Sequence, residues 1–198
     1  MSDGTSTSCR SARVRNRLPF RKESSFAKGD LRLTEDRPGD WFVASVRELS
    51  WQENELGATC EFDKQRNRFD EFGINLTVLR PRQPMTMYHR EGYQEGFLVL
   101  RGECLLIVEG SEVRLREWDY FHCPPDVTHA IVGSGVGLSL VLAVGSRVGP
   151  KMILYPRDET ALKHGAGVQK DTRDAQEAYA PFTRPAPEIR FRGEFLSE

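Results

Sequence analysis

The stretch from residue 89 to residue 129 decides how this chain folds, and it reads HREGYQEGFLVLRGECLLIVEGSEVRLREWDYFHCPPDVTH. Polar residues gather at its two ends, in residues 88–95 and 124–129. The sequence between these clusters is apolar and strand-like. Clusters that supply His and Glu side chains and are joined by strands predict a metal pocket inside a β-barrel.

Short apolar runs separated by Gly and Pro continue on both sides of this stretch. The clearest run is 73–79, where apolar side chains alternate until the chain approaches Pro81. Further strands are expected at residues 85–91, 95–100, 104–108, 113–115, 118–123, 129–132 and 138–144. We expect 104–108 and 113–115 to form a hairpin, and the last two strands to pair around the Gly-rich turn at 133–135. Many short strands without a long helical period predict an all-β antiparallel sandwich or barrel.

Two imidazoles and two carboxylates are the candidate metal ligands. In an extended strand from 85 to 91, His89 and Glu91 share one face with Met85 and Met87 and follow these two methionines inward. Glu95 can join them after the bend that Gly92 permits, and the turn before His129 brings this second histidine in from another strand. Imidazole and carboxylate ligands suit Zn, Fe, Mn, Ni or Cu, and they do not suit metals that select thiolate ligands.

These residues resemble the two motifs of the cupin superfamily. The first motif reads GxxxxxHxHxxxExxxxxxG, and the spacing of His89, Glu91, Glu95 and Gly102 matches its core. The second reads GxxxxxPxGxxHxxxN, and Pro124-x-Asp126-xx-His129 matches its Pro and His. The short segment between the motifs is similar to that of small single-domain microbial cupins. The resemblance implies a double-stranded β-helix, the cupin jelly-roll barrel, with a metal held by His89, Glu95 and His129, and with Glu91 as a fourth ligand.

Four positions depart from the motifs. Glu91 stands at the second His position, Trp118 and Asp126 replace two glycines, and Gly133 replaces the final Asn. Asp accepts left-handed backbone conformations better than most residues, so Asp126 fits a tight turn. A site with two His and one carboxylate is the pattern of non-haem Fe(II) oxygen chemistry, whereas a fourth ligand at Glu91 leaves fewer open positions.

Four further residues are candidates for substrate binding. Met87 and Phe97 belong to the predicted apolar barrel lining, which would also line a ligand pocket. Gln94 lies on the bend beside the metal, where a role in the turn is equally consistent. His122 alternates with Phe121 along a strand. The pattern favours a hydrogen-bonded residue in the wall of the barrel over a metal ligand.

The bulk properties set the domain plan. The chain has 198 residues and a formal net charge of −1, which offers no global field for nucleic acid or an anionic membrane. We expect a mobile basic arm at 1–38, a cupin barrel at 39–157 and, at 158–198, a C-terminal tail with short helices that packs on the barrel or on a partner subunit. Four scattered cysteines without a CxxC pair, no signal-peptide core and no membrane-length apolar run favour the cytoplasm. The resemblance and the apolar tail residues favour a homodimer.

The expected function is that of a metal-binding cupin that acts on a small-molecule ligand. One divalent metal per chain (Zn, Fe, Mn or Ni) would support dioxygenase chemistry or isomerase and lyase chemistry. The alternative is a non-catalytic cupin that binds or senses a small ligand. Fold alone does not choose between an enzyme and a binding protein.

Overall fold

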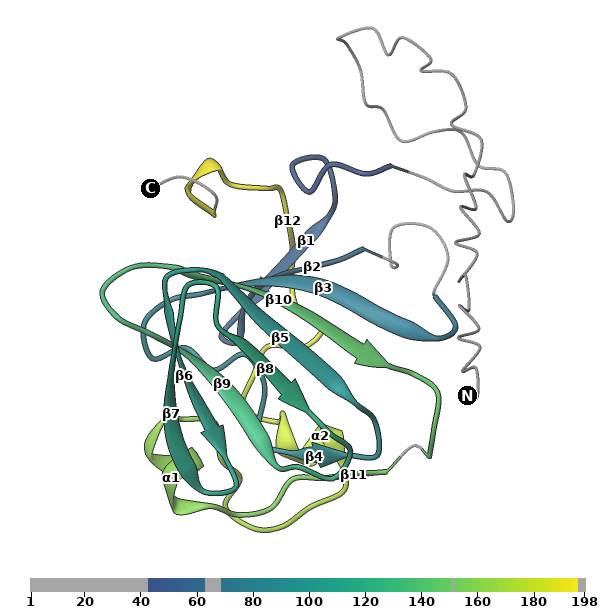
Figure 1. The fold of residues 1–198 in the computed structure, drawn as a ribbon, viewed down its shortest axis with the longest axis vertical. Coiled ribbons are helices and arrows are strands. Elements are labelled where there is room, and N and C mark those ends of the chain that lie inside the picture. Colours follow the sequence, from purple (N-terminus) through teal and green to yellow (C-terminus); the bar gives the residue numbers. More distant parts are fainter. Residues whose placement is uncertain (1–42, 63–68, 151, 196–198) are drawn as a thin grey trace, which may run out of the picture. The chain divides into compact units, whose positions relative to one another are not determined.

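β-Strands form most of the regular structure (Figure 1). A computed structural model describes residues 43–62, 69–150 and 152–195, so the predicted arm at 1–38 lies outside the described residues. The strands are β1 (Trp51–Asn54), β2 (Gly57–Glu61), β3 (Phe72–Leu79), β4 (Arg90–Glu91), β5 (Glu95–Arg101), β6 (Glu103–Val108), β7 (Ser111–Arg116), β8 (Tyr120–Cys123), β9 (His129–Ser134), β10 (Ser139–Ser146), β11 (Ile153–Leu154) and β12 (Glu188–Ile189). The helices are short: α1 (Glu159–Lys163), α2 (Ala175–Ala178) and one 3-10 turn, η1 (Gly193–Phe195).

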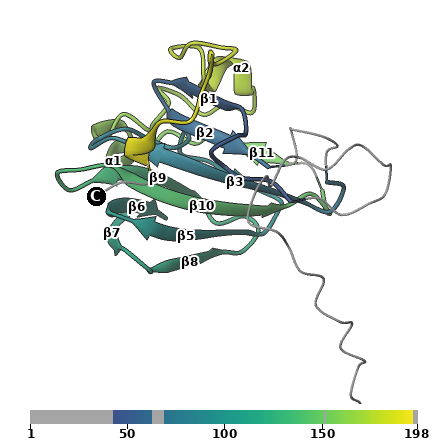
Figure 2. The same cartoon turned by 90° about the horizontal axis from the view of Figure 1, so that it is seen from above.

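Two antiparallel sheets face each other and confirm the predicted all-β jelly roll. The larger sheet has the order β12-β1-β2-β3-β10-β5-β8, and the smaller has the order β7-β6-β9. Figure 2 shows the larger sheet running from β8 to β1. A short third pairing joins β4 to β11. The predicted hairpin of β6 and β7 is present, with a turn at Glu109 and Gly110.

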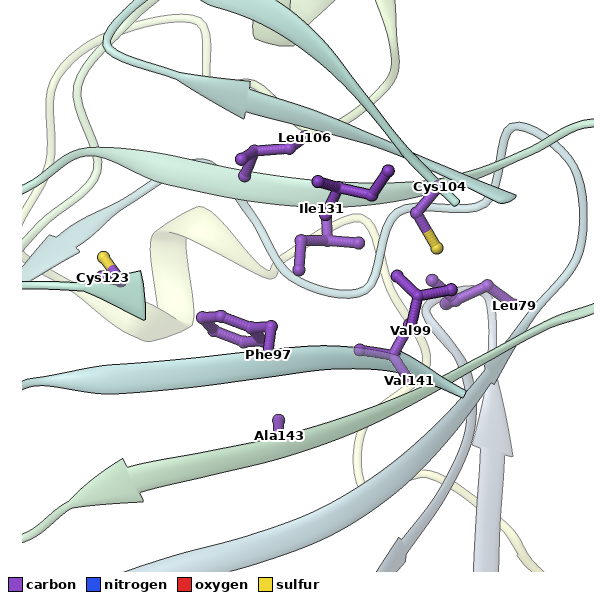
Figure 3. Close-up of a cluster of buried hydrophobic side chains, with 10 residues drawn as sticks. Leu79, Phe97, Val99, Cys104, Leu106, Cys123, Ile131, Val141 and Ala143 are labelled. Carbon is purple, nitrogen blue, oxygen red and sulfur yellow. The ribbon is translucent and has the colours of Figure 1, made fainter. Parts of the chain in front are cut away.

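Apolar side chains from both sheets fill the space between them. Cys104, Leu106 and Ile131 of the smaller sheet face Phe97, Val99 and Val141 of the larger one (Figure 3). Val99 and Val141 are fully buried, and Ile131 is 1% exposed. Fully burying one such side chain contributes about 1.5–3 kcal/mol to the free energy of unfolding, so this cluster between the two sheets is a main source of stability.

The predicted pairing of residues 129–132 with 138–144 is wrong. β9 pairs with β6 in the smaller sheet, whereas β10 pairs with β3 and β5 in the larger sheet. Gly133 lies inside β9 and not in a turn, and a Cβ there would lie 2.2 Å from the carbonyl oxygen of Arg80. Alternation along two neighbouring strands is the same whether they form a hairpin or cross between sheets, so the sequence pattern could not distinguish these connections.

The predicted strand from 85 to 91 is also irregular, because only β4 at its end is regular strand. Met85 packs against the cluster between the sheets, but Met87 packs against Tyr155 and Val168 of the C-terminal segment. The expected shared face of Met85 and Met87 is therefore wrong. The backbone N–H groups of this segment bond to partners outside any regular ladder, and these bonds override the strand period.

Two motif departures fall where the chain adopts a left-handed backbone. Trp118 has φ +71° and Asp126 has φ +65°. Both stand where the cupin motifs have glycine, and glycine is the residue that enters this region without steric cost. The fold therefore accepts Asp126 as expected and holds Trp118 in a strained conformation.

The C-terminal segment packs on the barrel. The Asp158 side chain accepts a hydrogen bond from the N–H of Ala161 and so caps α1, and Gly165, with φ +72°, follows the helix end. Asp174 caps α2 in the same way, and β12 adds to the larger sheet by pairing with β1. Among the described residues, no helix is long and apolar enough to cross a membrane.

Candidate metal centre

Three predicted ligands come together at one end of the two sheets. His89 precedes β4, Glu95 begins β5 and His129 begins β9. The two histidines exchange backbone hydrogen bonds, with N···O distances of 3.0 and 2.8 Å. One ligand atom from each of the three residues lies within 4.8 Å of the other two. The backbone pairing of His89 with His129 therefore joins two residues that are far apart in the sequence, and Glu95 at the start of β5 completes the cluster.

Both imidazoles are oriented in the same way. Nδ1 of His89 lies 2.7 Å from the carbonyl oxygen of Met87, and Nδ1 of His129 lies 3.2 Å from that of Val127. A carbonyl only accepts, so each Nδ1 carries the proton and each neutral ring presents the lone pair of Nε2. Backbone partners that fix the tautomer in this way are typical of metal-ligating histidines.

The Glu95 carboxylate completes the donor set. Its Oε2 atom is buried without a hydrogen-bond partner and lies 3.3 Å from Nε2 of His129. The contact is close enough for an ion pair, but with Nδ1 protonated a neutral His129 offers no proton to it. Two facing lone pairs require a cation between them, either a proton on Nε2 or a metal ion. Two Nε2 atoms and an unsatisfied carboxylate oxygen fit a divalent metal.

The electrostatics of the metal-free cluster agree with this geometry. Burial and the neighbouring His129 lower the pKa of His89. Burial also opposes a charge on His129, but the Cys123 sulfur and the Glu95 carboxylate outweigh it and raise the pKa of His129 to about 10. The metal-free protein therefore holds a second proton on the His129 ring, on Nε2 facing Glu95, where a metal would lie.

Glu91, the fourth predicted ligand, lies beside the cluster and not among its three ligand atoms. Burial raises the pKa of Glu91 to about 7, and the adjacent Glu95 carboxylate adds to this shift. Two carboxyl groups side by side cannot both ionise easily. Glu91 is therefore a carboxyl group that can keep a proton next to the ligand Glu95.

The predicted substrate residues separate into two groups. The Phe97 ring lies 5.3 Å from the ring of His129, and the Met87 carbonyl holds His89, so both residues adjoin the centre. Gln94 is exposed, and His122 is exposed on β8 opposite Phe121 and Cys123, which face inward. The structure does not bring Gln94 or His122 to the centre.

Several neighbours of the centre were not predicted. The Cys123 sulfur lies 3.3 Å from Nδ1 of His129, and the Phe121 ring lies 5.8 Å from the His129 ring. Tyr155 places its ring 5.8 Å from that of His89, and Tyr179 packs edge-on against Tyr155. The alternation of Phe121 and Cys123 with exposed residues is a signal for the first pair. The two tyrosines come from the C-terminal segment, and the sequence contains no signal that places them here.

Comparison with known proteins identifies a cupin domain within the chain. The family model described as a cupin domain matches residues 75–144, a range that contains the three ligands. The sugar phosphate isomerase of Silicibacter pomeroyi, from the cupin superfamily, is 19% identical over 55% of this chain and 84% of its own, with a TM-score of 0.44.

Two further solved structures have similar scores. A double-stranded β-helix cupin from Methanocaldococcus jannaschii is 19% identical over 39% of this chain and 72% of its own, with a TM-score of 0.37. A protein from Acidithiobacillus ferrooxidans is 22% identical over 49% of this chain, with a TM-score of 0.43, and the match spans only 64% of its length. No curated protein matches the chain. The family match shows that residues 75–144 form a cupin domain, and the jelly-roll topology of the described strands agrees with it.

Proposed function

We propose that this chain is a metal-dependent cupin enzyme that transfers protons on a small molecule, as an isomerase or a lyase. The observation that carries the proposal is the orphaned Oε2 atom of Glu95, which faces Nε2 of His129 beside the correctly oriented His89. A metal held by these three residues would act as a Lewis acid on a substrate oxygen.

The side chains around the centre would perform the rest of the reaction. Glu91 is not one of the three clustered ligands, so its carboxyl group is available to take a proton from the substrate and return it. The Glu95 side chain is 16% exposed and that of His129 only 3%, so the carboxylate is the more accessible of these two ligands. The stacked rings of Phe97 and Phe121 lie beside the His129 ring and give the centre apolar surroundings.

Glu91→Gln tests this assignment. The amide keeps the size of the side chain but cannot carry the proton. The variant should therefore bind one metal per chain as the wild type does, but its turnover of substrate should fall by a factor of about 100 or more. Glu159→Gln is the matched control, because Glu159 lies in α1 with a side chain that is 76% exposed. A Glu91→Gln variant with wild-type turnover would remove Glu91 from the mechanism, and one without metal would make it a ligand.

The assay follows proton exchange in D2O by NMR over a panel of small hydroxy and carbonyl compounds, with oxygen consumption recorded in parallel. Exchange without oxygen uptake supports the isomerase or lyase proposal. The second candidate is a dioxygenase, which is favoured by the two-His, one-carboxylate ligand set. Oxygen uptake by the Fe(II)-loaded protein would select it. Saturable binding without turnover would select the non-catalytic binding protein.

A further inference from the structure

The chain segment that carries His89 is held mainly from outside the barrel. The N–H of Met87 donates to the hydroxyl of Tyr179 at 3.2 Å, and the N–H of Tyr88 donates to the carbonyl of Ala166 at 2.7 Å. The next N–H, that of His89, donates to the carbonyl of His129. Two of three consecutive backbone donors thus bond to the C-terminal segment, and only the third bonds within the cupin domain.

The side chains of this segment repeat the pattern. Met87 is 3% exposed and packs with Tyr155, Val168 and Ala178, all from beyond the family match that ends at residue 144. The Tyr155 ring lies 5.8 Å from the His89 ring and contacts Tyr179 edge-on. The segment before β4 thus has a wall built by residues that the cupin domain itself does not supply.

One route connects this wall to the ligand atom. The hydroxyl of Tyr179 accepts a hydrogen bond from the N–H of Met87. The carbonyl of Met87 in turn accepts a hydrogen bond from Nδ1 of His89 at 2.7 Å. Moving the Met87 backbone therefore moves the acceptor that sets the tautomer and the ring direction of His89. Partners of this kind typically change metal affinity 10–100-fold when they are removed.

We propose that Tyr179 and Tyr155 are positioning residues of the metal centre: Tyr179 fixes the backbone that orients His89, and Tyr155 packs against the His89 ring. The inference rests on the proposed metal site but does not depend on the reaction. It makes the C-terminal segment part of the centre, since the cupin domain supplies the three ligands and residues 155–179 fix the direction of one of them.

Tyr179→Phe is the test, because it deletes the hydroxyl and keeps the ring. The matched control is Ser139→Ala. Ser139 is fully buried, and its hydroxyl donates to the carbonyl of Glu103, in a bond that joins β10 to β6 and involves no residue of the segment that carries His89. Both variants lose one buried hydrogen bond, and only one of these bonds leads to His89. Tyr155→Leu, which removes the ring beside His89, is a second variant.

The probe is Co²⁺, measured by chelator competition for affinity and by visible absorption for ligand geometry. Measurements are made below the unfolding midpoints of all the metal-free proteins. Tyr179→Phe should weaken Co²⁺ binding about tenfold. Both Tyr179→Phe and Tyr155→Leu should change the visible spectrum, and Ser139→Ala should change neither property.

Each other outcome counts against the inference. Wild-type affinity and spectrum in Tyr179→Phe would overturn it and leave the metal site intact. Equal weakening of Co²⁺ binding in Ser139→Ala would show a general loss of stability and would overturn the positioning role of Tyr179. A wild-type protein that does not bind Co²⁺ would overturn the proposed function and this inference together.

Discussion

Replacing Glu95 by Gln tests whether this carboxylate is in place for a metal or for the stability of the fold. Its Oε2 atom is buried, has no hydrogen-bond partner and faces Nε2 of His129 at 3.3 Å. A Gln amide can donate a hydrogen bond to the Nε2 lone pair, which a carboxylate cannot do. Glu95→Gln therefore removes a metal ligand and supplies the missing donor at the same time.

The two roles predict different effects of an added metal on the free energy of unfolding. The metal-free protein holds an extra proton on His129 opposite Glu95, and breaking a buried ion pair costs about 3–5 kcal/mol. The new hydrogen bond from the Gln amide offsets about 0.5–1.5 kcal/mol of this, so the metal-free variant should lose about 2–4 kcal/mol. If Glu95 served the fold alone, an added metal would stabilise neither the wild type nor the variant. A metal at 100 times its Kd stabilises a protein by about 2.7 kcal/mol, and for a chain of this size that raises Tm by about 5–10 °C. The variant should lose this increase.

The assay is thermal unfolding with and without Zn²⁺, Mn²⁺, Co²⁺ or Fe²⁺, and Glu159→Gln is the exposed control. Wild type and control should gain Tm with at least one metal, and Glu95→Gln should start from a lower metal-free Tm and gain none. A wild type whose Tm does not respond to any of these metals, together with a fall in the metal-free Tm of Glu95→Gln, would show that Glu95 serves the fold and not a metal.

Three further predictions concern the fold and the charges around the centre. Trp118→Gly relieves a left-handed conformation worth about 1–2 kcal/mol, at an entropic cost of about 0.5–1 kcal/mol. The Trp118 side chain is 67% exposed, so the variant should gain about 1 kcal/mol in thermal unfolding, and a loss would contradict the strain. Gly133→Ala places a Cβ 2.2 Å from a backbone oxygen and should cost about 1–3 kcal/mol. Gly137→Ala, where a Cβ meets nothing within 4 Å, should be near neutral, and equal effects would contradict the close approach. Folding raises the pKa of Glu91 from 4.5 to about 7 and that of His129 from 6.5 to about 10, so these groups stabilise the metal-free protein at low pH. That stability should fall as the pH rises from about 4.5 to 7 for Glu91 and from about 6.5 to 10 for His129. Glu91→Gln should remove the first fall, and an unchanged Tm profile would contradict this.

The parts of the fold that follow local rules were predictable from sequence. Alternation located β3, the β6–β7 hairpin and most other strands. The connection from β9 to β10 was not predictable, because alternation reports which face a side chain takes and not which sheet a strand joins. The register of the two sheets depends on the packing between them.

Likewise, some residues of the site could be predicted from the sequence and others could not. His89, Glu95 and His129 could be found because motif spacing specifies ligands on strands that the fold then pairs. Tyr155 and Tyr179 could not be found, because their contacts with His89 and Met87 depend on where the C-terminal segment packs. Gln94 was a candidate because it lies on the bend beside Glu95, and His122 because it alternates with Phe121 along a strand, but both side chains are exposed.

The most direct test of the central claim is the metal content of the purified protein. Elemental analysis is made after reconstitution with a divalent metal and removal of the excess, for the wild type and for His129→Ala. We expect one metal ion per chain in the wild type and a loss of bound metal in the variant. A wild type without stoichiometric metal, or a His129→Ala variant with the same metal content, would contradict the proposed metal centre.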